Sequence, residues 1–259
     1  MAHVANLRCA WLPKAGRSAE EYEDAFRPCI AGAYPLGLEL RCAVADGATE
    51  SSFARLWARQ LVRVYCNGAT PLHDAAGFRQ KVEQQCARWM HYVFAKPLAW
   101  NFQAKAQRGA FATLAGILLT RGEDGAGRWD AWSVGDSCLF QLRTGELIHA
   151  FPSLQAADFG FHPQLLCSIA GANESIWAEF DQHAATGEWA AGDQFLLMTD
   201  ALGRWFAEGV ENGSRPWEAL LAASSAPEMF AQWVAERRDA GEMNNDDVTL
   251  LALAIEENA

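Results

Sequence analysis

Short acidic stretches, far apart in the chain, stand next to apolar runs that predict β-strands, and this pattern constrains the fold most strongly. Residues 40–45, 195–198 and 248–255 are such runs. The acidic positions are Glu23, Asp24, Asp46, Asp200, Asp246 and Asp247. Carboxylates at strand ends converge only if the strands lie side by side, so the pattern indicates a sheet with an acidic end.

Gathered carboxylates repel one another unless cations neutralise them. Hard divalent cations such as Mg²⁺ and Mn²⁺, which prefer carboxylate, carbonyl and water oxygens, meet that need. The first hypothesis is therefore a hydrolase with two metal ions. The alternative is that each Asp only caps a turn after its strand, which is the commoner role of a single Asp.

Six motifs in a fixed order carry a resemblance to a known family. They are residues 21–26 (EYEDAF), 44–47 (VADG), 109–114 (GAFATL), 134–137 (VGDS), 197–200 (LMTD) and 246–249 (DDVT). In this order they resemble the metal-dependent serine/threonine protein phosphatases of the PP2C (PPM) type, with the chain as a divergent bacterial-type member. The resemblance extends from about Cys9 to Ile255.

The resemblance implies an α+β fold, a four-layer α/β/β/α sandwich of two antiparallel sheets flanked by helices. It also implies hydrolysis of phosphomonoesters by water activated between two metal ions, with no covalent phosphoenzyme. Asp46, Asp200 and Asp246 would be the catalytic ligands. The full implied metal set is Asp24, Asp46, Gly47, Asp136, Asp200 and Asp246, with Glu23 holding water beside it. The cofactors would be two, or with Asp136 three, Mg²⁺ or Mn²⁺ ions.

Several positions depart from the family pattern. Ala48 stands where many members have a histidine, and Ala19 stands where a phosphate-binding arginine is expected. Arg17 and Lys14 are the nearest cations. We expect Arg17 to bind the substrate phosphate, because a planar guanidinium group can donate hydrogen bonds to two phosphate oxygens at once. These departures leave a second hypothesis open, a catalytically weak or inactive regulatory binding module. A phosphatase for small metabolites is a third.

Composition sets further limits. A chain of 259 residues with 51% hydrophobic residues can form one large core, so we expect a single domain over residues 1–259. The net charge of −11 disfavours nucleic acid and anionic membranes as partners. We expect a cytoplasmic protein that acts on a phosphorylated protein, in a system with a Ser/Thr kinase. Arg55, Arg59 and Arg63 recur at helical spacing, which is typical of a solvated helix face.

The seven cysteines form no Cys-x-x-Cys pair, which argues against a disulfide framework or a structural zinc site. The histidines show no metal-ligand spacing, although one of them could replace the missing histidine as general acid. Trp205, five residues after Asp200, is a candidate for an aromatic platform at the site.

The periodicity predicts two long helices, a later helical region and a series of strands. Helices are expected over residues 51–64, with Thr49, Ser51 or Ser52 as N-cap, over 75–94, and in a region over 217–238. Strands are expected over residues 113–120, 129–134, 138–143 and 146–150, besides the three apolar runs above.

Overall fold

The structure is a computed structural model. It describes residues 2–37, 39–48, 53–68, 74–95, 97, 99–122, 125–152, 155–160 and 163–258. The three residues expected as N-caps of the first long helix, Thr49, Ser51 and Ser52, lie outside the described residues.

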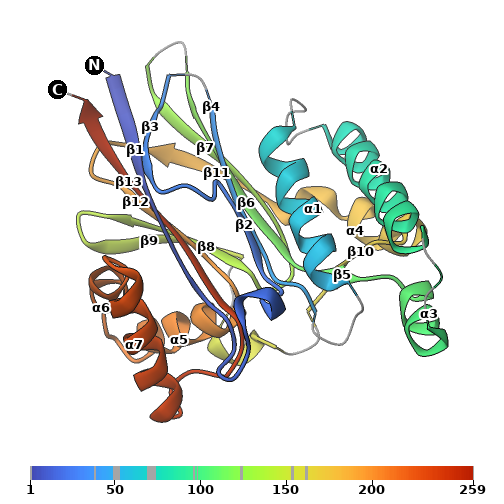
Figure 1. The fold of residues 1–259 in the computed structure, drawn as a ribbon. Helices are drawn as coiled ribbons and strands as arrows, with labels where there is room; N and C mark the ends of the chain where they lie inside the picture. The colour runs from blue at the N-terminus through green and yellow to red at the C-terminus, as the bar shows by residue number, and fades with distance from the viewer. Residues whose placement is uncertain are drawn as a thin grey trace.

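The larger sheet has six antiparallel strands in the order β3-β1-β13-β12-β8-β9. Its strands are β1 (Ala2–Leu12), β3 (Gly32–Pro35), β8 (Cys138–Arg143), β9 (Glu146–Phe151), β12 (Gln194–Met198) and β13 (Val248–Asn258). The first and last strands of the chain pair along their whole length, from Ala2 opposite Asn258 to Leu12 opposite Val248. The two chain ends therefore lie together, and residues just after β1 lie beside residues just before β13 (Figure 1).

The second sheet has five antiparallel strands in the order β11-β7-β6-β4-β2. Its strands are β2 (Ala25–Arg27), β4 (Glu39–Ala45), β6 (Leu114–Arg121), β7 (Gly127–Val134) and β11 (Ala184–Trp189). A small pair, β5 (Phe111–Ala112) and β10 (Leu166–Cys167), lies beside it. Within this sheet β2 is an edge strand, paired only with β4.

A buried apolar layer joins the two sheets face to face. Leu7 and Leu251 from the six-stranded sheet pack with Cys42, Ile117 and Trp129 from the five-stranded sheet. Because alternate side chains of a strand point to opposite faces, the other face of each sheet needs a cover of its own.

Helices α1 (Ala54–Asn67) and α2 (Ala75–Val93) cover the outer face of the five-stranded sheet (Figure 1). Trp57 of α1 and Trp89 of α2 are fully buried in this layer. The packing is close, because a Cβ atom on Gly116 of β6 would lie 2.4 Å from the Cζ atom of Tyr65. Helix α3 (Trp100–Gln107) follows α2.

Helices α5 (Asp200–Glu211), α6 (Pro216–Ala223) and α7 (Pro227–Asp239) cover the outer face of the six-stranded sheet (Figure 1). The single helical region expected over residues 217–238 is therefore two helices, because Pro227 lacks the amide hydrogen that a helix interior uses and instead begins α7. Trp205 packs edge-on against Trp233, with ring centroids 4.7 Å apart, so its ring lies between α5 and α7.

The remaining short elements are α4 (Glu174–Ala178) and the 3-10 turns η1 (Ala19–Glu21), η2 (Ala156–Asp158), η3 (Ala170–Asn173) and η4 (Phe180–His183). The four layers confirm the predicted α/β/β/α sandwich. None of the helices in the described part of the chain combines the length and the apolar character that a bilayer crossing requires. All seven cysteines are free thiols.

Candidate functional site

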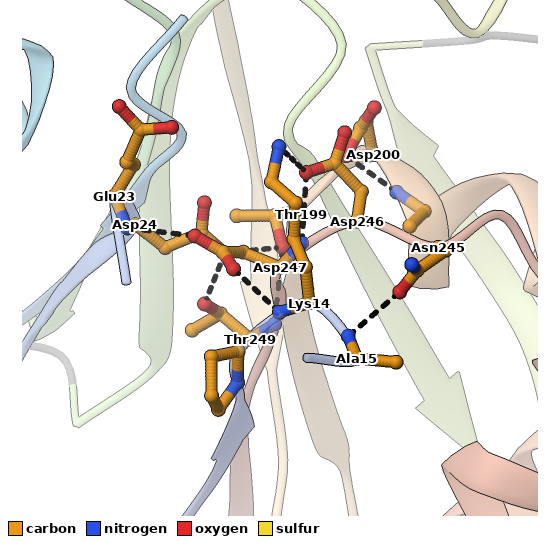
Figure 2. Close-up of polar contacts among 12 residues, drawn as sticks. Lys14, Ala15, Glu23, Asp24, Thr199, Asp200, Asn245, Asp246, Asp247 and Thr249 are labelled. Carbon is orange, nitrogen blue, oxygen red and sulfur yellow. Dashed lines mark hydrogen bonds and ion pairs between the residues drawn. The ribbon is translucent and has the colours of Figure 1, made fainter. Parts of the chain in front are cut away.

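The expected acidic residues come from both sheets and meet where strands of the two sheets end. Asp24 precedes β2, Asp46 follows β4, Asp136 lies between β7 and β8, Asp200 begins α5 one residue after β12, and Asp246 precedes β13. Figure 2 shows Asp24, Asp200 and Asp246 at this place, together with the residues that hold them.

The carboxylates lie close enough to change one another's ionisation. Burial first, and then the charges of Asp24 and Asp246, raise the pKa of Asp46 well above its usual value. Burial, followed by the charges of Asp46 and Asp136, raises the pKa of Asp200 in the same direction. Burial also raises the pKa of Asp136, with a smaller contribution from Asp246. The arrangement would therefore be stabilised by added positive charge.

Asp24 is buried and held by two threonine hydroxyls. Thr249 donates to its Oδ2 atom at 2.6 Å and Thr199 donates to the same atom at 2.9 Å (Figure 2). Burial raises the pKa of Asp24 to about 8, with further contributions from Asp247 and Asp200. Its other oxygen, Oδ1, is buried and has no hydrogen-bond partner of good geometry among the described residues, although the Asp46 carboxyl lies near enough to lower the pKa of Asp24. A buried oxygen of this kind is what a cation would complete.

The turn before β13 ties the N-terminal segment to the site. Asp247 accepts hydrogen bonds from the backbone amides of Lys14 at 2.8 Å and Glu23 at 2.6 Å. Asn245 accepts a hydrogen bond from the amide of Ala15 at 2.7 Å (Figure 2). Asp247 is thus a structural anchor, and it places residues 14 and 23 beside the acidic cluster.

A cation of the chain itself reaches this cluster. The Nζ atom of Lys14 lies 2.7 Å from Oδ1 of Asp246 (Figure 2). Burial alone would lower the pKa of Lys14, but the hydrogen bond to Asp246 and the charges of Asp246 and Asp247 raise it. From the sequence, Lys14 is only one of the cations nearest to Ala19. Its pairing with Asp246 depends on the β1–β13 register, which no local pattern reveals.

Arg17, the residue expected to bind phosphate, pairs with Glu21 at the surface, and its side chain is 59% exposed. It nevertheless lines the same groove as Lys14, Glu23 and Arg55, a hollow of about 380 Å³. The predicted contact between Arg17 and phosphate stays a prediction.

The backbone around Asp46 is fixed from the five-stranded sheet. The amide of Asp46 donates to Oγ1 of Thr113 at 2.9 Å, and the amide of Thr113 donates to the Asp46 carbonyl at 2.9 Å. Gly47 forms a bridge with Ala112, and a Cβ atom at Gly47 would lie 2.8 Å from the carbonyl oxygen of Glu23. Only glycine fits there without a shift of the backbone.

A second hollow, of about 610 Å³, is lined by Asp136 and His183. The Nδ1 atom of His183 donates to the Ser133 carbonyl at 3.0 Å, and Nε2 is buried without a partner among the described residues. His183 is thus a candidate for the replacement general acid, because it lines the same hollow as Asp136. His73 and His162 lie outside the described residues.

The donor set suits a hard divalent cation, because it consists of carboxylate oxygens and includes one buried oxygen without a partner. Within the described ranges, however, no three His, Cys, Asp or Glu side chains already stand at the spacing of a bound ion. An ion bound by Asp246 would compete with Lys14 for that carboxylate.

Comparison with solved structures supports the fold. The catalytic domain of the serine/threonine phosphatase PstP with two manganese ions is 17% identical, with a TM-score of 0.59, and the match covers 98% of this chain and 100% of that one. The Mycobacterium tuberculosis PstP/Ppp phosphatase is 19% identical, with a TM-score of 0.60 and the same coverage. The S. agalactiae serine/threonine phosphatase is 11% identical, with a TM-score of 0.52, and the match covers 97% of this chain and 100% of that one.

No protein-family model and no curated protein matches the sequence. The structural matches confirm the resemblance at the level of the fold: the chain has the fold of the PP2C (PPM) phosphatases.

Proposed function

We propose that the protein is a metal-dependent phosphoprotein phosphatase that hydrolyses serine or threonine phosphomonoesters. The observation that carries the proposal is the convergence of Asp24, Asp46, Asp136, Asp200 and Asp246 where strands of the two sheets end, with an unpaired buried oxygen on Asp24. The PP2C fold supports the same class of reaction.

In this proposal Asp46, Asp200 and Asp246 hold two Mg²⁺ or Mn²⁺ ions. The Gly47 carbonyl and Asp24 complete the set, Asp136 adds a further ligand, and Glu23 positions water beside them. When bound, such ions lower the pKa of water and offset phosphate charge.

The protein's own residues position the substrate and the ligands. Thr199 and Thr249 hold one oxygen of Asp24 by hydrogen bonds, which leaves the other oxygen free to act as a ligand. Arg17, from the groove beside the cluster, provides positive charge for the phosphate, while Lys14 pairs with Asp246. A phosphorylated protein is the substrate class, with a Ser/Thr kinase as the opposing activity.

The pairing of Lys14 with Asp246 favours one alternative, the catalytically weak binding module. The Lys14 ammonium group lies 2.7 Å from Asp246, one of the proposed ligands, and offsets its negative charge. The acidic cluster is therefore partly stabilised without metal, which a binding module would need. Ala48, where many PP2C members have a histidine, points the same way.

The deciding experiment is turnover of a phosphothreonine peptide, and of para-nitrophenyl phosphate, in Mn²⁺ and in EDTA. We expect Mn²⁺-dependent release of phosphate that is lost in the Asp46→Asn protein. An absence of turnover on both substrates in saturating Mn²⁺ would favour the binding module.

A further inference from the structure

Four arginines line one groove beside the candidate site. Arg55, Arg59 and Arg63 lie four residues apart on α1 and so share one face of the helix. Arg27 reaches the same groove from β2, and the groove has a volume of about 430 Å³. Helix α1 lies directly over the five-stranded sheet near this edge strand (Figure 1).

Few carboxylates offset the positive charge of these arginines. Among the described residues, Arg27, Arg59 and Arg63 form no ion pair with a carboxylate. Arg55 donates to the main-chain oxygen of Glu20, with the Glu20 carboxylate nearby, but its Nε atom is buried without a partner. Partial burial, and then the charges of Arg55 and Arg63, lower the pKa of Arg59. A groove of this charge is notable on a chain with a net charge of −11.

The groove continues into the candidate site. Asp24 lines it together with Arg55 and Arg59. Arg55 also lines the neighbouring groove that contains Lys14 and Arg17. A chain whose phosphorylated residue reaches the acidic cluster would therefore lay its neighbouring residues along the arginines.

The shape of the groove suits an extended peptide. The three residues of β2, the last strand of the five-stranded sheet, line part of the groove. The rings of Trp11 and Tyr22, with centroids 4.7 Å apart, contribute an apolar part of the lining. An extended peptide commonly binds beside an exposed sheet edge.

We propose that this arginine groove, lined by Arg27, Arg55, Arg59 and Arg63, binds an Asp- or Glu-rich segment next to the phosphorylated residue of a protein substrate. The assignment rests on the proposed function for the position of the phosphorylated residue. Charge complementarity selects the acidic segment, because carboxylates would pair with guanidinium groups that the described chain leaves without ion pairs.

The first test measures binding without turnover. A fluorescein-labelled, unphosphorylated Glu-rich peptide is titrated with the full chain, and a Gln-rich peptide of equal length serves as the ligand control. We expect Arg59→Glu to weaken binding of the Glu-rich peptide about tenfold, because an attraction becomes a repulsion. Arg8→Glu is the matched control, since Arg8 is exposed on β1 and does not line the groove.

The second test measures selectivity during turnover. Phosphothreonine peptides with Glu flanks and with Gln flanks are compared by the ratio of their kcat/KM values. The ratio should favour Glu flanks in the wild type and in Arg8→Glu, and should fall to about one or below in Arg59→Glu. A phosphothreonine peptide with Lys flanks should have a higher kcat/KM with Arg59→Glu than with the wild type.

Equal effects of Arg59→Glu and Arg8→Glu on peptide binding would overturn the proposal. So would tighter binding of a single-stranded oligonucleotide with the same dependence on Arg59, which would make nucleic acid the partner. Specific binding of the Glu-rich peptide without turnover of any phosphopeptide would instead remove the proposed phosphatase function and leave the acidic-peptide groove standing.

Discussion

The ammonium group of Lys14 lies 2.7 Å from a carboxylate oxygen of Asp246 and so places a fixed positive charge in the acidic cluster. Lys14 reaches this position because β1 and β13 pair along their whole length and because Asp247 binds the Lys14 amide. In the absence of metal, the lysine offsets part of the repulsion among the aspartates.

Replacing Lys14 with methionine removes this charge and keeps most of the side-chain volume. We expect Lys14→Met to bind Mn²⁺ more tightly than the wild type, by roughly threefold to tenfold, because Asp246 no longer has an internal partner. Calorimetric titration with Mn²⁺ measures the change. Lys105→Met on α3, where the lysine is exposed, is the control; equal affinities in all three proteins would show that Lys14 does not compete with the metal.

Stability without metal should fall as pH rises. Burial raises the pKa of Asp24 to about 8, and those of Asp46 and Asp200 are raised as well, so the folded apo protein holds protons that the unfolded chain releases near pH 4. The contribution of these groups is complete below the unfolded pKa and is lost as pH rises through the folded pKa. Urea unfolding in EDTA should therefore give a lower free energy at pH 8 than at pH 5.5.

Bound Mn²⁺ should reverse this trend, because it stabilises the ionised carboxylates. At a hundredfold excess over its dissociation constant it should add about 2.7 kcal/mol to the free energy of unfolding. Identical unfolding curves in EDTA and in millimolar Mn²⁺ at pH 8 would support the alternative in which the aspartates only cap turns.

Arg17 gives a prediction about substrate binding. We expect Arg17→Ala to raise KM for a phosphopeptide about tenfold, which corresponds to ~1.4 kcal/mol of lost binding. Arg204→Ala is the matched control, because Arg204 also pairs with a carboxylate four residues later on the surface, in Glu208. Unaltered kinetics in Arg17→Ala would mean that Arg17 stays with Glu21 and does not contact the phosphate.

Gly116 tests the packing of the outer helical layer. A Cβ atom there would lie 2.4 Å from the ring of Tyr65, so Gly116→Ala must displace α1 or the sheet. We expect a loss of about 1–3 kcal/mol in the free energy of unfolding. Gly171→Ala, at a position with open space around it, should change stability little in the same urea titration.

Local patterns predicted the elements whose apolar residues repeat regularly. The strand over residues 138–143 matches β8, and the helix over residues 75–94 ends one residue later than α2. The helix over residues 51–64 matches α1 less closely, since α1 begins at Ala54 and ends at Asn67. β1 was not predicted, although its buried Ala5 and Leu7 alternate with less buried neighbours, and its partner β13 lies at the opposite end of the chain.

The site shows the same division. Asp46, Asp200 and Asp246 could be proposed from their places next to strands, and the structure brings them within electrostatic reach of one another. Lys14 and the threonine hydroxyls on Asp24 could not be placed from local sequence, because they depend on contacts over more than 170 residues of chain.

Calorimetric titration of the wild type and of Asp46→Asn with Mn²⁺ tests whether the acidic cluster is a metal site. Asp46 would be a ligand of the proposed metal site, so loss of its charge should weaken Mn²⁺ binding by at least about tenfold. We expect two Mn²⁺ ions per wild-type chain and weaker binding in Asp46→Asn. Equal Mn²⁺ binding by the two proteins would contradict it.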